Sequence, residues 1–340
     1  MTLSLASRPK SGGEGSSRPR VLIARPRLDC SFKPGPVPET RGEPLNRVLR
    51  LFGQLIDQLA EAHGRLGHLV DVEERPLWQF DLQSLQAKAA AYDRVYFPHK
   101  QSRQFPIGKN AFYYKNAAFP EWLTVDPRGW GASLSWSPLS PGNPDEADWA
   151  LFRTLQARIA DNVSLFEQPD RVEVQEPGYL LFVCQLPHDE TIQFHSDVKV
   201  ETALAAVLAF AEASGQRAVV KCHPAGRNSM APLREAAAAC PFATWVEKAS
   251  IHSCIAGAST VYLVNSGVGF EAMLHDKPIV RFGEAEYSAI VPKAEPTVVS
   301  LAALAGRAHN LEDYVGFIAS FKRRCLSLDD ADSAIRIAAI

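Results

Sequence analysis

The fold of this chain is organised around the stretch Ser259-Thr-Val-Tyr-Leu-Val-Asn-Ser-Gly-Val-Gly-Phe-Glu-Ala-Met-Leu274. Its residues 260–264 are rich in β-branched and aromatic side chains, as a buried parallel strand is, and residues 267–274 then change to helical spacing. A helix that begins directly after a strand exposes unpaired backbone N–H groups, and the Ser266 hydroxyl lies beside them. The stretch therefore predicts a strand, a glycine-rich turn and a helix that together bind an anion.

The composition limits the classes to which the protein can belong. The 340 residues are 46% hydrophobic, which is enough for two domains with a core each. The formal net charge of −2 provides no basic field, so no nucleic-acid partner is predicted. No segment approaches the roughly 20 apolar residues of a membrane span. Six cysteines without a CxxC pair favour a cytoplasmic protein, with peripheral contact at the inner face of the cytoplasmic membrane left open.

Strands and helices are expected to alternate in both halves of the chain. The first half is expected to form strands 20–25, 68–72 and 94–98, and helices 45–63, 82–92 and 145–163. The second half is expected to form strands 179–184, 217–222, 243–246, 260–264 and 278–282, and helices 198–214 and 232–239. This alternation predicts parallel sheets with right-handed crossovers, and hence two Rossmann-like domains that face each other across a cleft.

Changes in residue composition along the chain predict the boundaries of the α/β domains. Residues 1–18, rich in serine, glycine and basic side chains, are expected to form a disordered tail. Residues 119–131 are interpreted as an ordered loop, because they contain large apolar side chains that need burial. The predicted division is a first domain at 19–165, a linker at 166–177, a second domain at 178–310, and a C-terminal helix and tail at 311–340 that cross back over the domain junction.

Polar clusters follow three strands of the second domain. They are Gln185 to Asp189, Lys221 to Arg227, and Asn265 with Ser266. Because the carboxyl ends of parallel strands meet at one edge of a sheet, we expect all three clusters to converge on one crevice. Cations and a helix N-terminus bind phosphate, and a carboxylate among them can act as nucleophile or base. Taken singly, each cluster also has a structural interpretation as a turn or a helix cap.

Other kinds of site are less well supported. Residues 267–272 fit the G-x-G-x-x-A dinucleotide pattern, but that turn normally follows the first strand of its domain, whereas here it follows a later one. The nine histidines form neither HExxH nor a close pair, so no metal site is predicted. Neither a GxSxG turn nor a P-loop is present in the sequence.

The three clusters together resemble motifs of the bacterial capsular-polysaccharide and lipopolysaccharide β-Kdo transferases. Residues 185–189 match Q-x-x-x-D, residues 221–227 match K-x-H-P followed by R, and residues 264–283 match V-N-S-x-V-G-F-E-A-M-L-x-x-K-P-I-V-x-F-G. Order and spacing agree over residues 178–290, and Tyr287 takes the place of a family aromatic residue. The resemblance implies a GT-B-like fold with an acceptor domain followed by a donor domain.

The resemblance also implies roles for individual residues. Asp189 would be the nucleophile that takes Kdo from CMP-β-Kdo as a covalent adduct, so that the β configuration is retained. His223 and Ser266 would bind the donor phosphate, while Lys221 and Arg227 would neutralise the phosphate or the sugar carboxylate. The remaining expected donor-binding residues are Gln185, Pro224, Asn265, Gly267 and Glu271. No metal or cofactor is implied.

The general acid/base is expected to come from the first domain. Glu121 is the predicted residue and Asp126 the substitute, although the first domain departs from the acidic-aromatic pattern of the capsule branch. A structural role for Glu121 as a loop carboxylate is the alternative interpretation. The glycines of the opening stretch would let the backbone approach a nucleotide monophosphate.

The leading hypothesis is a retaining β-Kdo transferase that acts on a growing surface glycan. Its partners would be a CMP-sugar donor and a glycan or glycolipid acceptor. One alternative is an inverting, sialyltransferase-like enzyme in which Asp189 acts as a base. Another is a non-catalytic protein that binds nucleotide sugars.

Overall fold

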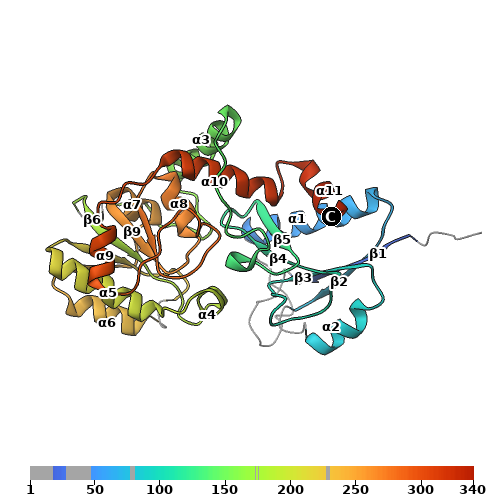
Figure 1. The fold of residues 1–340 in the computed structure, drawn as a ribbon, viewed down its shortest axis with the longest axis horizontal. Coiled ribbons are helices and arrows are strands. Elements are labelled where there is room, and N and C mark those ends of the chain that lie inside the picture. The colour runs from blue at the N-terminus through green and yellow to red at the C-terminus, as the bar shows by residue number, and fades with distance from the viewer. Residues whose placement is uncertain (1–17, 28–46, 77–80, 173, 175, 227–229) are drawn as a thin grey trace, which may run out of the picture.

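The computed structural model describes residues 18–27, 47–76, 81–172, 174, 176–226 and 230–340. Two lobes lie next to each other, each built around its own sheet with helices on its faces (Figure 1). The predicted α/β architecture of two Rossmann-like domains is therefore confirmed. The predicted tail, up to residue 17, and Arg227 lie outside the described residues.

The first sheet has six strands in the order β11-β5-β4-β3-β1-β2. Strands β1 to β4 pair in parallel, whereas β5 and β11 add two antiparallel strands at one edge. The strands are β1 (Arg20–Pro26), β2 (Leu69–Arg75), β3 (Arg94–Pro98), β4 (Ala111–Asn116), β5 (Trp122–Asp126) and β11 (Leu326–Ser327). The order 2-1-3-4 of the parallel strands is that of a flavodoxin-like sheet.

Helices cover both faces of this sheet. They are α1 (Arg47–Arg65), α2 (Leu82–Ala89) and α11 (Ala331–Ala339). The 3-10 turn η2 (Gly131–Ser133) follows β5 in the chain, and α3 (Glu146–Ala160) packs against helices of the second lobe. One core joins Phe52 and Leu59 of α1 with Ile337 of α11, so the C-terminal helix packs beside α1. A second core on the other face contains Leu85 of α2.

The second sheet is entirely parallel, with the order β10-β9-β6-β7-β8. Its strands are β6 (Tyr179–Val183), β7 (Ala218–Lys221), β8 (Ala243–Val246), β9 (Ala258–Leu263) and β10 (Ile279–Arg281). Its helices are α4 (Glu190–His195), α5 (Val200–Ser214), α6 (Ala231–Ala239), α7 (Ile251–Gly257), α8 (Val268–Leu274) and α9 (Val298–Leu304). In chain order the strands run 3-2-1-4-5, so the direction of winding reverses between β6 and β9, where ligands bind in such sheets.

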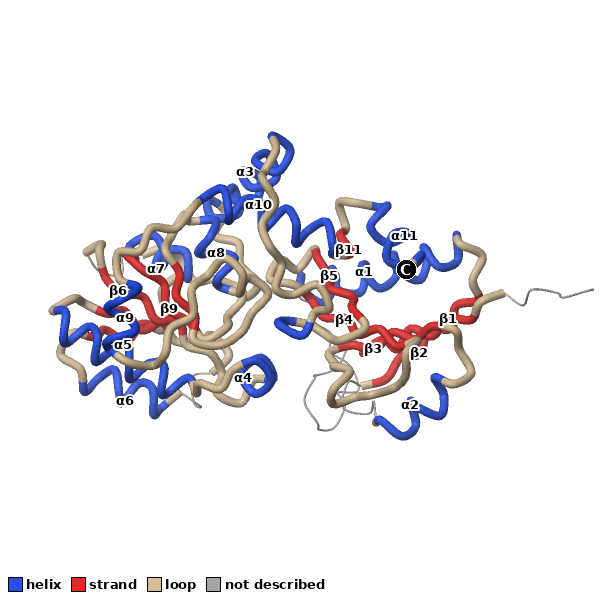
Figure 2. The backbone as a smooth tube through the Cα atoms, viewed as in Figure 1, coloured by secondary structure: helices blue, strands red, loops and turns tan. Residues whose placement is uncertain are grey.

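The chain returns to the first lobe at its C-terminus. Helix α10 (Leu311–Arg324) extends from the second lobe to the junction between the lobes in Figure 2, and α11 follows beside α1. Arg323 of α10 forms an ion pair of 2.6 Å with Asp148 of α3, and β11 then pairs with β5. The predicted helix that crosses the junction is confirmed. None of the helices in the described ranges combines the length and apolar character that membrane crossing requires.

Candidate active site

A cavity of about 660 Å³ lies between the lobes and is lined by residues of both. The second lobe contributes the segments that follow β6, β7 and β9, and the first lobe contributes the end of β4 with Trp130. Residues 164–169, most of them predicted to be linker, form a further wall. The structure thus brings the three predicted clusters together in one cavity, and its volume is in the usual range for small-molecule sites.

Asp189 lies at the N-cap of α4 and lines this cavity. Its Oδ1 accepts hydrogen bonds from the backbone N–H of Thr191 at 2.8 Å and from the Thr191 hydroxyl at 2.6 Å. Burial alone would raise the pKa of Asp189, but these two bonds and the charges of Lys115 and His223 outweigh it and lower the pKa below its usual value. The carboxylate is therefore ionised and held in one orientation at neutral pH.

Gln185 and Asn265 connect the segments around Asp189. The Gln185 amide donates to Asn265 Oδ1 at 2.9 Å, and Gln185 Oε1 accepts from the backbone N–H of Val264 and Asn265. The Asn265 amide donates to the carbonyl oxygen of Thr191 at 2.8 Å. Both side chains line the cavity as predicted, but they use their polar atoms to hold the ends of β6 and β9 and the start of α4 in place.

His223 and Lys221 occupy the segment after β7. The backbone N–H of Ala225 donates to His223 Nδ1 at 3.2 Å, which leaves the proton of the neutral ring on Nε2. Burial lowers the pKa of His223, although Asp189 raises it in part.

Lys221 Nζ donates to the carbonyl oxygens of Cys222 at 3.2 Å and Glu247 at 3.1 Å. The Lys221 ammonium group therefore connects the ends of β7 and β8. Pro224, next to His223, is exposed and lines the cavity.

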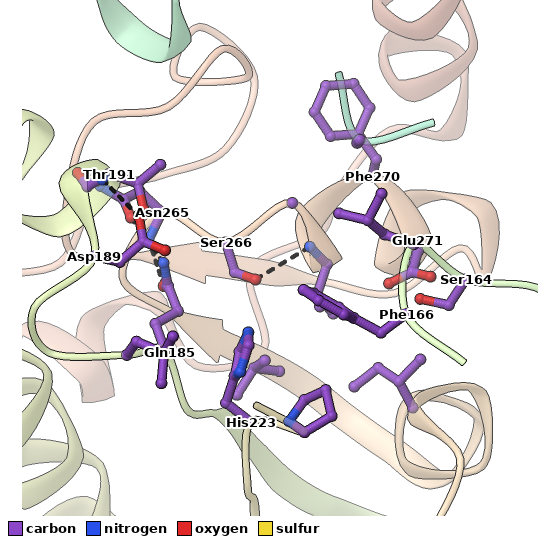
Figure 3. A pocket seen from close by; sticks show the side chains of 18 of the residues that line it. Ser164, Phe166, Gln185, Asp189, Thr191, His223, Asn265, Ser266, Phe270 and Glu271 are labelled. Carbon is purple, nitrogen blue, oxygen red and sulfur yellow. Dashed lines mark hydrogen bonds between the residues drawn. The ribbon is translucent and has the colours of Figure 1, made fainter. Parts of the chain in front are cut away.

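Ser266 lies between the Asp189 side and the Glu271 side of the pocket (Figure 3). Its Oγ accepts from the backbone N–H of Val268 at 3.2 Å, and its hydroxyl proton has no acceptor among the described residues. Gly267 is exposed at the N-cap of α8, with an ordinary φ of −57°. A Cβ atom there would meet only Ala118, at 3.8 Å.

Gly269 has a different role from the one that the glycine pattern indicated. A Cβ atom at this position would lie 2.6 Å from the ring of Tyr287. The Tyr287 hydroxyl in turn donates to the carbonyl oxygen of Ser266 at 2.6 Å. The missing side chain at Gly269 thus makes room for a tyrosine that supports the Ser266 turn, so the predicted phosphate approach is not what requires glycine here.

Glu271 follows on the first turn of α8 and lines the far side of the cavity. Burial raises its pKa to about 7, against smaller opposing effects of a Ser164 hydrogen bond and the Arg158 charge. His252 Nε2 lies 3.9 Å from Glu271 Oε1. Ser164 and Glu271 lie close together in Figure 3, so this carboxyl group connects the second lobe to the segment between the lobes.

The structure does not support the predicted acid/base residues. Glu121 is absent from the residues that line the cavity, and its carboxylate is paired with Arg47 and, at 2.8 Å, with Arg158. Asp126 is 1% exposed, and its carboxylate accepts from Ser135 and from the backbone N–H of Arg128. The geometry agrees with the alternative interpretation of Glu121 as a structural carboxylate.

Lys115 and Glu286 are among the titratable cavity residues that were missed in the sequence. Lys115 is the last residue but one of β4, and Glu286 follows β10. Burial raises the pKa of Glu286, while the charge of Lys115 lowers it in part. No motif marks either residue, because they meet only when the two lobes come together.

The family comparison covers the segment that contains most of the site. Residues 149–290 match the family model described as "Capsule polysaccharide biosynthesis protein". The predicted family resemblance is thus confirmed for this segment, which includes Asp189, His223 and Ser266. No curated protein sequence matches the chain.

Similar solved structures share little sequence with the chain. Two are from Thermosulfurimonas dismutans KpsC. The "beta Kdo 2,7 transferase" is 14% identical with a TM-score of 0.49, covering 88% of this chain and 89% of that chain. The "beta Kdo 2,4 transferase" is 13% identical with a TM-score of 0.47, covering 78% and 85%. A UDP-GlcNAc 2-epimerase from Methanocaldococcus jannaschii is 7% identical with a TM-score of 0.40, covering 94% and 98%.

Proposed function

We propose that this protein is a retaining β-Kdo transferase, which moves Kdo from CMP-β-Kdo to a capsule or lipopolysaccharide acceptor. The observation that carries the proposal is the position of Asp189, an ionised and fixed carboxylate in the same cavity as His223 and Ser266. All three lie in the segment that matches the capsule polysaccharide family model. The partners are a CMP-activated donor and a glycan or glycolipid acceptor, and the proposed location is the cytoplasm, at the inner face of the membrane.

The donor phosphate would be held by two neutral hydrogen-bond donors. The Nε2–H of His223 is available because Nδ1 accepts from Ala225, and the Ser266 hydroxyl is available because its oxygen accepts from Val268. Hydrogen bonds from these groups stabilise the charge that develops on CMP as it leaves. A CMP leaving group needs no protonation in this scheme.

Transfer would then take place in two displacements. First, a carboxylate oxygen of Asp189 bonds to the anomeric carbon, while the bond from that carbon to the phosphate oxygen breaks and its electron pair departs with CMP. Second, an acceptor hydroxyl oxygen attacks the same carbon, its proton passes to a base, and the Asp189 carboxylate is released. Two inversions at one carbon give net retention.

Glu286 is the cavity carboxyl group that we assign to the acceptor proton, in place of Glu121. Its raised pKa brings it closer to neutral pH, where a general base is most effective. It lines the same cavity as Asp189.

The configuration of the product tests the proposed function. Purified protein is incubated with freshly made CMP-β-Kdo and a glycan acceptor, and the new linkage is examined by NMR. A β-linked product is expected. An α-linked product would contradict retention and favour the inverting alternative, whereas CMP binding without any transfer would favour a non-catalytic binding protein.

A further inference from the structure

Lys115 is a cavity residue whose ammonium group has no ionic partner among the residues that the structure describes. Lys115 Nζ lies 3.5 Å from the centroid of the Trp130 ring, a cation–π contact that holds the end of the side chain. Within the described part of the chain, the ammonium group forms neither a hydrogen bond nor an ion pair. Because a charge that is partly removed from water normally has such a partner, its absence indicates space for an anionic ligand.

Three carboxylates of the cavity act on the charge of Lys115. Burial is the larger effect and lowers the pKa of Lys115 below its ordinary value, while the carboxylates of Asp189, Glu190 and Glu286 raise it in part and so support the ammonium form. These are groups of the second lobe, whereas Lys115 belongs to β4 of the first lobe. Lys115 and Asp189 therefore line the cavity from different lobes, and each charge stabilises the other.

The other cavity cations are less suited to an anion near Asp189. Lys221 Nζ already donates to two backbone carbonyl oxygens. Burial lowers the pKa of both His223 and Lys115, but the ordinary value is 6.5 for the histidine and 10.5 for the lysine, so only the lysine starts well above neutral pH. Lys248 lines the cavity but is exposed to solvent. Of the described lysines that line the cavity, only Lys115 is partly buried, has an ammonium group without a hydrogen bond to another described residue, and is attracted by the charge of Asp189.

The chemistry of the donor explains why a cation is needed at this place. An ulosonic acid carries its carboxylate on the anomeric carbon itself. When Asp189 approaches that carbon to about 3 Å, the distance of a reactive complex, two carboxylates are brought together and repel each other. A fixed cation beside both of them offsets this repulsion without a reorganisation of solvent.

We propose that Lys115 binds the carboxylate of the transferred sugar and thereby makes the site specific for acidic sugars over neutral ones. The inference rests on the proposed function and adds to it the recognition of the sugar charge. Donor binding would then require both lobes, because Asp189 and His223 belong to the second lobe and Lys115 to the first.

The test compares K115M and K115R with the wild type and with K109M, which removes the charge of an exposed lysine in the same lobe. For each protein, kcat and KM for CMP-β-Kdo and the Kd for CMP are measured. K115M is expected to lower kcat/KM on the order of 30-fold or more, as the loss of a desolvated charge pair does. It leaves the CMP Kd unchanged, which also shows that the variant is folded. K115R recovers most of the activity, and K109M resembles the wild type.

The outcomes separate this inference from the function on which it rests. K115M with an unchanged kcat/KM would overturn the role of Lys115 while wild-type transfer still stands. K115R with a normal KM and a lost kcat would also overturn it, and would indicate that Lys115 moves a proton. A wild-type protein that neither binds CMP nor transfers Kdo would overturn the proposed function, and with it the role of Lys115.

Discussion

The amide of Gln185 donates to the side-chain oxygen of Asn265 over 2.9 Å, and the Gln185 oxygen accepts from the Asn265 backbone over the same distance. Through the Asn265 amide this pair also reaches the carbonyl oxygen of Thr191, whose N–H and hydroxyl hold Asp189. The nucleophile predicted from one motif is thus positioned by residues of two motifs. This network explains why the motifs occur together.

Replacing Gln185 by leucine should break that network. The buried Asn265 N–H and side-chain oxygen would lose their partners, at a cost of about 2–4 kcal/mol for unpaired buried groups. Urea unfolding measures this loss, and the transfer rate should fall with it, because Asp189 loses its orientation. Q54L, at an exposed position of α1, is the control and should change stability by less than about 0.5 kcal/mol. Equal stability of Q185L and Q54L would contradict a positioning role.

Gly269 should be far less tolerant of alanine than Gly267. The added Cβ atom at position 269 meets the Tyr287 ring at 2.6 Å, whereas that at position 267 meets only Ala118 at 3.8 Å. Overpacking of this kind costs about 1–3 kcal/mol, so thermal or urea unfolding should separate G269A from G267A. If the two variants are equally stable, the close approach of Tyr287 is not what requires glycine.

Glu271 should make the free energy of unfolding depend on pH. Its pKa is about 7 in the folded protein against a usual value of 4.5. The folded state therefore binds the proton more tightly, and this contribution is complete below about pH 4.5 and is lost as the pH rises through 7. A difference of this size corresponds to roughly 3 kcal/mol.

The variant E271Q tests this dependence, since glutamine does not ionise. Urea unfolding at pH 5 and at pH 8 should show a smaller fall in stability for E271Q than for the wild type. E235Q, at an exposed position of α6, should follow the wild type. A wild-type profile for E271Q would mean that the carboxyl group is not the source of the pH dependence.

Glu286 and Glu121 should differ in their effect on the reaction. E286Q removes the proposed base for the second displacement, so the rate of transfer should fall by about 100-fold or more and the covalent adduct should accumulate. E121Q breaks ion pairs with Arg47 and Arg158 outside the cavity, so the expected change is in stability. If E121Q stopped transfer and accumulated the adduct while E286Q transferred Kdo normally, Glu121 and not Glu286 would be the base.

Much of the fold could be predicted because its parallel strands are short apolar runs separated by amphipathic helices. Strand β5 was interpreted as loop, because it lies among prolines and glycines and pairs antiparallel with β4. Helix α4 has six residues and α9 has seven, and neither was predicted. Helix α11 follows α10 closely and was not predicted as a separate element.

The candidate site could be predicted in part for a similar reason. Asp189, His223 and Ser266 follow strands of one parallel sheet, and local sequence is enough to bring such positions together. The roles of Lys221 and Gln185 could not be predicted, because their polar atoms bind backbone groups that are distant in the sequence. Lys115 could not be predicted because its partners belong to the other lobe.

The central claim is that Asp189 bonds covalently to the sugar, and intact-protein mass spectrometry tests it most directly. Wild-type protein is mixed with CMP-β-Kdo generated in place, without acceptor, and its mass is measured over time beside that of D189N. The account predicts a mass increase of one Kdo residue on the wild type, mapped by peptide sequencing to Asp189, and none on D189N. Normal transfer by D189N would contradict it.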